Sequence, residues 1–198
     1  MKKYYACILL NDKNEKFIFT SWEECKNKII GQKNKIKSFK TKEEANKWLL
    51  ENGKINTCHP KGIYFDSGTG RGQGVEVRVV NEKGISIIDK VVKQNFINDY
   101  NNYYVKNFNG ISNNYGELLG LYIALKIALQ ENTKNIFGDS KLVIDYWSKG
   151  FYNKNLNKNT IKLIQNVIKL RNIFENSGGQ IVLISGNNNI ADLGFHKR

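Results

Sequence analysis

The sequence has little of what a zinc site, a disulfide framework or a membrane span requires. Its 198 residues include two histidines, three cysteines and one proline, with no CxxC pair. Zinc would find too few ligands, and the odd, unpaired cysteines suit a reducing cytoplasm, where we expect the protein. No apolar run approaches the ~18 residues of a membrane span, and the start lacks a signal-peptide cleavage site. We expect no membrane association.

Acidic residues are also scarce relative to basic ones. Thirty-one Lys and Arg stand against 18 Asp and Glu, a formal net charge of +13. Such an excess indicates a polyanionic partner, either nucleic acid or an anionic membrane surface. Because no basic amphipathic helix favours the membrane, nucleic acid is the better candidate. The alternative is that Lys-, Asn- and Ile-rich usage reflects an AT-rich genome.

The first fifty residues predict a small α+β domain. Strands are expected at 4–9, 16–21 and 35–39, and helices at 22–30 and 42–50. Ser21 is a plausible N-cap for the first helix, and Thr41 with Glu44 forms a capping box for the second. Residues 51–61 contain the one proline and little apolar character, so they are predicted to be a linker.

Residues 62–198 predict a second, larger α/β domain. Strands are expected at 62–68, at 135–140 and at 180–185, with two more inside 74–92 joined by Asn-Glu-Lys-Gly. Helices are expected at 113–129, 141–148 and 159–177, the last with an apolar stripe of Leu163, Val167, Leu170 and Phe174. The order predicts a mixed five-stranded sheet flanked by helices, whose late strands run parallel to the first through helical crossovers.

Four acids fall at informative places in this layout. Asp66 is expected to end the first strand, Glu117 to lie in the first turn of the long helix, and Asp139 to end the fourth strand; Asp192 follows the fifth. Open α/β sheets build their sites at the carboxyl ends of strands. Each acid also has an ordinary explanation. Asp66 suits a turn, Glu117 a capping box with Asn114, Asp139 a helix cap, and Asp192 an exposed loop.

Convergence of all four acids would favour a metal site. Carboxylates ~4 Å apart repel one another by several kcal/mol per pair at an effective dielectric near 20, and divalent cations remove that cost. Oxygen ligands suit Mg²⁺. Two such ions ~3.5–4 Å apart can clamp the attacking and leaving oxygens of a phosphoryl displacement.

At these residues the sequence resembles the type-one ribonuclease H family. The likeness lies in "YFDSG", "NNYGELLGLYIAL", "GDSKLVID" and "NNNIAD", spread across residues 62–198. The resemblance implies a ribonuclease H-like fold. It also implies that Asp66, Glu117, Asp139 and Asp192 are the catalytic, metal-binding set for two Mg²⁺ ions, with Mn²⁺ as a substitute. Asn113 and Asn114 match a family pair, of which Asn114 would reach a ribose 2′-OH in the minor groove; helix N-capping is the alternative for both.

Residues 1–50 resemble the hybrid-binding (viroplasmin-like) domain that precedes many of these nucleases. The similarity lies in "YYAC", "FTSWEECK", "KIKSFKT" and "EEANKWL". It implies that Tyr5 and Trp22 form a pocket for the sugar-phosphate of the DNA strand; core packing is the alternative. The family's third aromatic and paired lysines fall on Ile36, Lys37 and Ser38, so one aromatic and one charge are missing and binding through this domain is expected to be weak.

The chain also departs from the family near its end. Asn187 stands where the loop before the last acid usually has a histidine, and only six residues follow Asp192. The tail residues His196, Lys197 and Arg198 could steady the scissile phosphate or help product release, in place of that histidine. The alternative is a frayed terminus.

The resemblance implies a monomeric endonuclease that hydrolyses the RNA strand of RNA–DNA hybrids and leaves 5′-phosphate and 3′-hydroxyl ends. The first domain would tether the hybrid, and duplex RNA is a further possible partner for it. One alternative is a non-catalytic protein that binds hybrid or duplex RNA on the same fold. Another is a different nuclease of that fold, such as a junction resolvase, against which the first domain argues.

Overall fold

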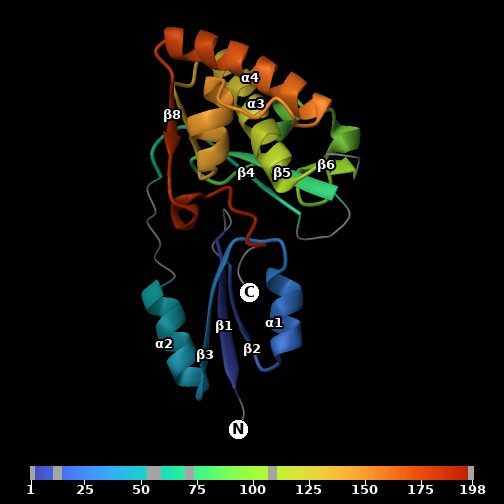
Figure 1. Cartoon of the computed structure of the whole chain (residues 1–198). Coiled ribbons are helices and arrows are strands. Elements are labelled where there is room, and N and C mark those ends of the chain that lie inside the picture. Colours follow the sequence, from blue (N-terminus) through green and yellow to red (C-terminus); the bar gives the residue numbers. More distant parts are fainter. Residues whose placement is uncertain (1–2, 11–14, 53–58, 70–73, 107–110, 196–198) are drawn as a thin grey trace. The chain divides into compact units, whose positions relative to one another are not determined.

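A computed structural model of the chain describes residues 3–10, 15–52, 59–69, 74–106 and 111–195. The chain divides into two compact units, one of residues 1–58 with 194–198 and the other of residues 59–193 (Figure 1). Among the described residues, no helix combines the length and apolar character needed to cross a membrane. The predicted boundaries at 50 and 62 stay predictions, although the last helix of the first unit continues to Asn52, inside the expected linker.

The first unit is a three-stranded antiparallel sheet with two helices. Strands β1 (Tyr4–Leu9), β2 (Lys16–Phe19) and β3 (Asn34–Phe39) pair in the order β2-β1-β3. Side chains of β1 alternate between two clusters, as strand geometry requires. Ala6 and Ile8 pack with helix α2 (Lys42–Asn52), and Cys7 and Leu9 pack with helix α1 (Trp22–Ile29). The predicted small α+β domain is confirmed.

The two helix starts of this unit follow the sequence signals to different degrees. Thr41 and Glu44 form the expected capping box, with Thr41 N–H donating to Glu44 Oε2 at 3.3 Å and Glu44 N–H donating to Thr41 Oγ1 at 3.2 Å. Ser21 occupies the N-cap position of α1, but its side chain makes no capping hydrogen bond. Helix α1 therefore depends on packing of its buried Cys25 more than on its cap.

The second unit contains the predicted mixed five-stranded sheet. Its strands are β4 (Ile63–Gly68), β5 (Gly74–Asn81), β6 (Tyr103–Lys106), β7 (Asn135–Gly138) and β8 (Gln180–Leu183), in the order β6-β5-β4-β7-β8. Strands β4, β5 and β6 pair antiparallel, whereas β7 and β8 run parallel to β4. The predicted mixed α/β sheet is confirmed, including the parallel late strands.

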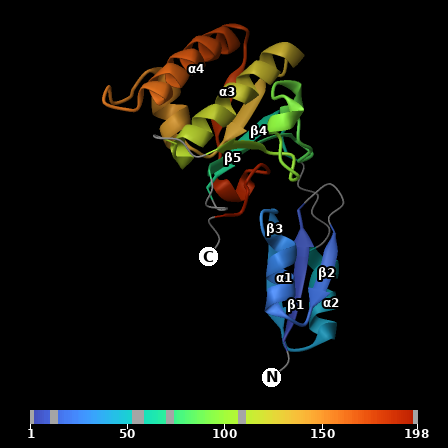
Figure 2. The same cartoon turned by 90° about the vertical axis from the view of Figure 1, so that its right-hand side faces the viewer.

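The two faces of this sheet are covered differently. Helices α3 (Asn113–Glu131) and α4 (Lys158–Asn176) lie on one face, and the segment after β8 lies on the other (Figures 1 and 2). Phe65 and Val77 belong to the large core beneath the helices. Tyr64 packs with Ile190 on the opposite face. The segment that carries Asp192 is thereby held against the sheet by its own apolar residues.

Two predicted elements differ from the structure. The third strand was expected within 85–92, but that stretch makes only a single bridge, at Ser86, and continues as a 3-10 turn at Ile88–Lys90. Burial of Ile87, Ile88 and Val92 draws it into the core, and β6 supplies the third strand instead. The helix expected at 141–148 is a π-helical turn at Leu142–Tyr146 followed by a 3-10 turn at Trp147–Lys149.

A buried arginine accounts for the irregular helix. Arg171 of α4 is only 6% exposed, and its Nη1 donates to the carbonyl oxygen of Ile144 at 2.6 Å. The same nitrogen donates to Ser148 Oγ. Because a carbonyl inside the turn is bonded from outside, the local backbone departs from the regular α-helical pattern.

The approach of β7 to β4 requires a glycine at position 138. A Cβ built on Gly138 would lie 2.3 Å from Phe65 Cζ, a distance at which atoms cannot coexist. Phe65 is fully buried and has no room to move away. Gly138 therefore sets the packing next to Asp139.

We expect Gly138→Ala to lower the free energy of unfolding by about 1–3 kcal/mol through overpacking, measured by urea denaturation. Gly120→Ala is the matched control. Its Cβ would contact the same Phe65 ring at 3.1 Å, and alanine gains about 1 kcal/mol of helix propensity, so a near-neutral effect is expected. Equal losses in the two variants would contradict the assigned role of Gly138.

Candidate functional site

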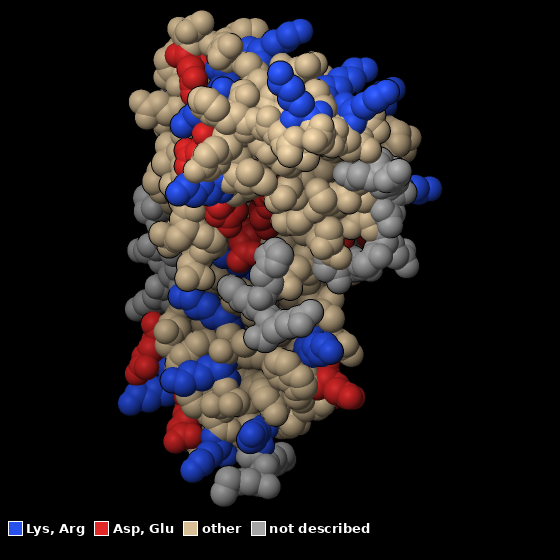
Figure 3. Space-filling model, viewed as in Figure 1, with Lys and Arg blue, Asp and Glu red and all other residues tan. Residues whose placement is uncertain are grey.

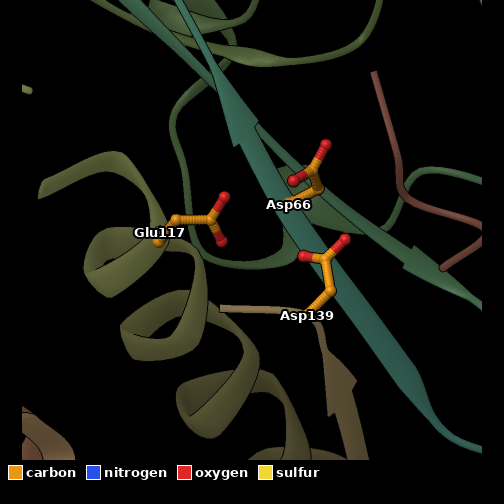
Figure 4. Close-up of side chains that lie close together, drawn as sticks. All are labelled: Asp66, Glu117 and Asp139. Carbon is orange, nitrogen blue, oxygen red and sulfur yellow. The ribbon is translucent and has the colours of Figure 1, made fainter. Parts of the chain in front are cut away.

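Three of the predicted acids come together at one end of the larger sheet. Asp66, Glu117 and Asp139 each offer a carboxylate oxygen, and these three atoms all lie within 4.8 Å of one another. Figure 4 shows the three side chains pointing toward a common space from β4, α3 and the end of β7. Figure 3 shows acidic side chains recessed below the surrounding surface. The group combines residues that are 73 positions apart in the sequence.

Strand register places Asp66 next to Asp139. Ile63 and Tyr64 of β4 pair in parallel with Ile136 and Phe137 of β7. The same register, continued along both strands, brings Asp66 beside Asp139, the residue directly after β7. Asp66 was expected at the end of its strand, but it is the fourth of six residues in β4 and pairs with Arg78 of β5. The correction matters because pairing with β5 fixes the Asp66 backbone, which a turn would not.

Close packing of α3 on the sheet brings in Glu117. A Cβ on Gly116 would lie 2.3 Å from Val75 Cγ1 and 2.8 Å from Ser67 Cβ, so only glycine permits this approach. Glu117 Oε1 then accepts a hydrogen bond from Ser67 N–H at 3.3 Å. Among the described residues, nothing donates a hydrogen bond to the buried Glu117 Oε2. A buried carboxylate oxygen of this kind needs a donor or a cation.

The capping explanation for Glu117 is wrong. The N-cap of α3 is Ser112, whose Oγ accepts a hydrogen bond from Tyr115 N–H at 3.2 Å. Glu117 was expected in the first turn of this helix. Because the helix begins at Asn113, Glu117 lies beyond that turn and caps nothing. Its side chain points at β4 instead, and the residue is only 5% exposed.

The electrostatics of the group disfavour three charged carboxylates, so the site favours either retained protons or a bound cation. Burial and the nearby Asp139 carboxylate raise the pKa of Asp66 from 3.8 to about 7, against the lowering effect of the Leu193 N–H. Burial, with the charges of Asp66 and Asp139, also raises the pKa of Glu117 well above its usual value. Like charges this close disfavour ionisation. Three carboxylates and an undonated buried oxygen therefore fit a hard divalent cation such as Mg²⁺ or Mn²⁺.

Asp192 lies beside this group but outside it. Its backbone N–H donates to the carbonyl oxygen of Asn189 at 3.1 Å, and its side chain is half-buried. The next residue, Leu193, donates its N–H to Asp66 Oδ2 at 2.8 Å. Asp192 also raises the pKa of Asp66, as the smallest of the causes. It is thus near enough to act with the other acids, and its role as a metal ligand stays a prediction.

Two residues that sequence analysis did not single out help to position the segment that carries Asp192 against the sheet. Asn189 is fully buried; its Nδ2 donates to the carbonyl oxygen of Phe65 at 2.9 Å and its Oδ1 accepts from Ala191 N–H at 3.0 Å. A Cβ on Gly186 would lie 2.9 Å from Asp139 Oδ2. Neither residue gives a sequence signal, because Asn189 is one of three successive asparagines and Gly186 simply follows a strand.

The asparagine pair and the substituted histidine position also lie near the acids. Asn113 accepts hydrogen bonds from Ser67 Oγ at its backbone oxygen (3.0 Å) and at Oδ1 (3.3 Å). Asn114 is exposed at the start of α3. Asn187 is exposed on a 3-10 turn at Gly186–Asn188, next to Gly186. The nucleic-acid roles predicted for Asn113 and Asn114 stay predictions.

The first unit brings together three of its four predicted binding residues. The rings of Tyr5 and Trp22 lie 5.5 Å apart, and Trp22 is 47% exposed, too much for simple core packing. Ser38 is exposed and pairs with Tyr5 across β1 and β3. Lys37 pairs instead with Ala6 and lies over the Phe39 ring at 5.6 Å, on the α2 side of the sheet. Strand alternation separates it from the aromatic pair.

The tail residues His196, Lys197 and Arg198 lie outside the described residues, and their auxiliary role stays a prediction.

Residues 3–49 match the family described as the ribonuclease H1 N-terminal domain, which confirms the resemblance predicted for residues 1–50. No curated protein matches the chain.

Two solved structures are similar to it. One is RNase H1 from the halophilic archaeon Halobacterium salinarum, with 19% identity over 67% of this chain and 91% of that one and a TM-score of 0.40. The other is the N-terminal RNase H domain of a Mycobacterium tuberculosis protein fused to maltose-binding protein, with 18% identity over 65% and 84% and a TM-score of 0.37.

Without divalent cations, we expect stability to fall as the pH rises from about 4 to about 7. In this window folded Asp66 keeps a proton that the unfolded chain has released, because its pKa is about 7 in place of 3.8. The folded state binds more protons, so its stability decreases with pH. Urea unfolding of the full chain in a chelator, at pH 4.5 and 7.5, measures the change.

Asp66→Asn is the comparison for this experiment. Asparagine still accepts the Leu193 N–H but cannot ionise, so the variant should lose less stability across the window. Mg²⁺ at pH 7.5 should recover most of the loss in the unaltered chain and less in the variant. The same pH slope in both proteins would contradict the expectation.

Proposed function

We propose that this chain is a ribonuclease H, an endonuclease that hydrolyses the RNA strand of RNA–DNA hybrids with two divalent metal ions. The observation that carries the proposal is the grouping of Asp66, Glu117 and Asp139 within 4.8 Å, in a chain whose first domain matches the ribonuclease H1 N-terminal family. Its net charge of +13 suits a nucleic-acid substrate. The proposed activity is taken from the ribonuclease H name of the matched proteins. The three acids of this chain are the residues proposed to carry it out.

In the proposed reaction, water attacks the scissile phosphorus and the P–O3′ bond breaks. The products carry a 5′-phosphate and a 3′-hydroxyl. Metal ions held by Asp66, Glu117 and Asp139, with Asp192 beside them, would activate the water and stabilise the leaving oxygen. The chain's own backbone orients these ligands, since Leu193 N–H fixes one oxygen of Asp66 and Ser67 N–H fixes one oxygen of Glu117.

Recognition of the RNA strand is proposed for the start of α3. Asn113 is held to Ser67 by its backbone and side-chain oxygens, which leaves the exposed Asn114 to reach a ribose 2′-OH. Tyr5 and Trp22 would bind the DNA strand through the first domain. Because the two domains are joined in one chain, even weak binding there raises the local concentration of hybrid.

A second candidate is a non-catalytic protein that binds hybrid or duplex RNA. Two observations favour it: Asn187 occupies the place of the family's histidine, and Asp192 is not among the acids within 4.8 Å. Incubation of labelled RNA–DNA hybrid, duplex RNA and duplex DNA with Mg²⁺, Mn²⁺ or chelator separates the two. Binding without cleavage in either metal would favour the second candidate.

Asp66→Asn should reduce hybrid cleavage by about 10³-fold or more, because metal-ion catalysis contributes several kcal/mol and each 1.36 kcal/mol is a factor of ten. Single-turnover cleavage at saturating Mg²⁺ is the measurement. Asp89→Asn is the control, since Asp89 is an exposed acid away from the group and should keep full activity. Near-normal cleavage by Asp66→Asn would refute the assignment.

Trp22→Ala should raise KM for long hybrids by roughly five- to tenfold, the loss of ~1–1.5 kcal/mol, with little change in kcat. The effect should be insensitive to sequence and should weaken with salt. Leu50→Ala is the control, because Leu50 is exposed on α2 of the same domain and far more accessible than Trp22. An unchanged KM at low salt would show that the first domain has another task.

A further inference from the structure

A cleft of about 430 Å³ lies at the outer edge of the larger sheet, apart from the acids. Strand β6 forms that edge. The cleft is lined by one segment before β6 and by β6 itself: Asn95, Phe96, Ile97, Asn98, Tyr103, Tyr104, Val105 and Lys106. Its volume is in the range of small-ligand sites.

The lining of this cleft has the chemistry of a nucleotide site. Phe96 is 51% exposed although it is a large apolar side chain. Its ring meets the Tyr103 ring edge-on at 6.3 Å between centroids. Lys106 is exposed at the end of β6. An accessible aromatic face beside a cation suits a planar base attached to a phosphate.

The edge of β6 in the cleft is already paired at one residue, which argues against a peptide strand as the occupant. Ile97 pairs with Tyr103 in an antiparallel bridge on the outer side of β6. A partner strand added to this edge would have to displace that pairing. A flat ring entering beside Phe96 would not.

A buried carboxylate holds the cleft in shape. Glu76 of β5 is 2% exposed, and its Oε2 accepts hydrogen bonds from Asn98 Nδ2 at 3.0 Å and Asn102 Nδ2 at 3.1 Å. Asn98 Oδ1 in turn accepts from the N–H groups of Tyr100 and Asn102 at 3.1 and 3.0 Å. The loop that follows Phe96 is thus fixed before any ligand arrives, which reduces the ordering cost of binding.

Strand register sets the distance from the cleft to the acids. Tyr104 pairs with Glu76, and Glu76 pairs with Gly68, two residues beyond Asp66. Two strand spacings of ~4.8 Å and two residues of ~3.3 Å give about 12 Å between the Tyr104 and Asp66 backbones. A stacked strand covers that distance with three or four nucleotides at ~3.4 Å each.

We propose that this cleft binds one unpaired nucleobase of a strand that continues beyond the hybrid. The base must be unpaired, because a base inside a duplex is stacked on both faces and offers none to a side chain. The preferred substrate is then a hybrid that adjoins a single-stranded segment, three or four nucleotides from the cleavage site. This inference rests on the proposed function and extends it to the substrate class.

The test measures binding, so it does not depend on cleavage. Full-length Asp66→Asn protein in Mg²⁺ is titrated with a blunt 12-base-pair hybrid and with the same hybrid carrying four unpaired nucleotides at the 5′ or 3′ end of either strand. At least one tail should tighten binding about five- to tenfold, in the range expected for stacking of one base. Phe96→Ala should abolish the gain, and Phe96→Trp should retain it.

Tyr100→Ala is the matched control, because Tyr100 is 47% exposed and close in sequence but does not line the cleft. It should keep the tail effect. Both alanine variants should bind the blunt hybrid like the parent, which shows that they fold. No gain from any tail, or equal losses in Phe96→Ala and Tyr100→Ala, overturns the cleft assignment. Failure of the parent to bind the blunt hybrid overturns the proposed function instead.

Discussion

The second unit is organised around three carboxylates that repel one another. At separations under 4.8 Å, each charged pair costs about 3–4 kcal/mol at an effective dielectric of 20. The chain gives only partial compensation, through one backbone N–H on Asp66 and one on Glu117. The repulsion that these N–H groups do not offset raises the pKa values of both residues. Without a cation, the repulsion within this group lowers the stability of the fold, as is common at functional sites.

Rigid secondary structure makes this possible, because each acid is held by a different kind of packing. Asp66 is inside a strand that pairs on both sides. Glu117 reaches that strand because Gly116 lets the helix approach it, and Asp139 follows the tight contact of Gly138 with Phe65. Asn189 fastens the last segment to the Phe65 carbonyl. Two of these contacts meet at Phe65, one residue before Asp66, so the core and the site share their support.

The first unit and the sheet edge add aromatic surfaces of a different kind. Trp22 and Phe96 are each about half exposed although burial would be favourable for both. Each has a second aromatic ring beside it, Tyr5 and Tyr103 respectively. Surfaces of this type bind sugars and bases without reading sequence. Together with the acids they are the surfaces on which the proposed nucleic-acid binding depends.

Local pattern in the sequence was enough for the fold class, the first domain and the grouping of three of the four predicted acids. The capping box of Thr41 and Glu44 and the parallel order of β4, β7 and β8 need only short-range signals and chain order. Tertiary structure decided the rest. The stretch at 85–92 is buried as a turn where a strand was expected, and Lys37 lies on the opposite face from Tyr5. Asn189 bonds the distant Phe65 carbonyl, while Gly186 and the Leu193 N–H lie against acids far along the chain. Periodicity in the sequence indicates which side chains are buried. Contacts between residues more than a hundred positions apart form only when the sheet and its covering segments pack together.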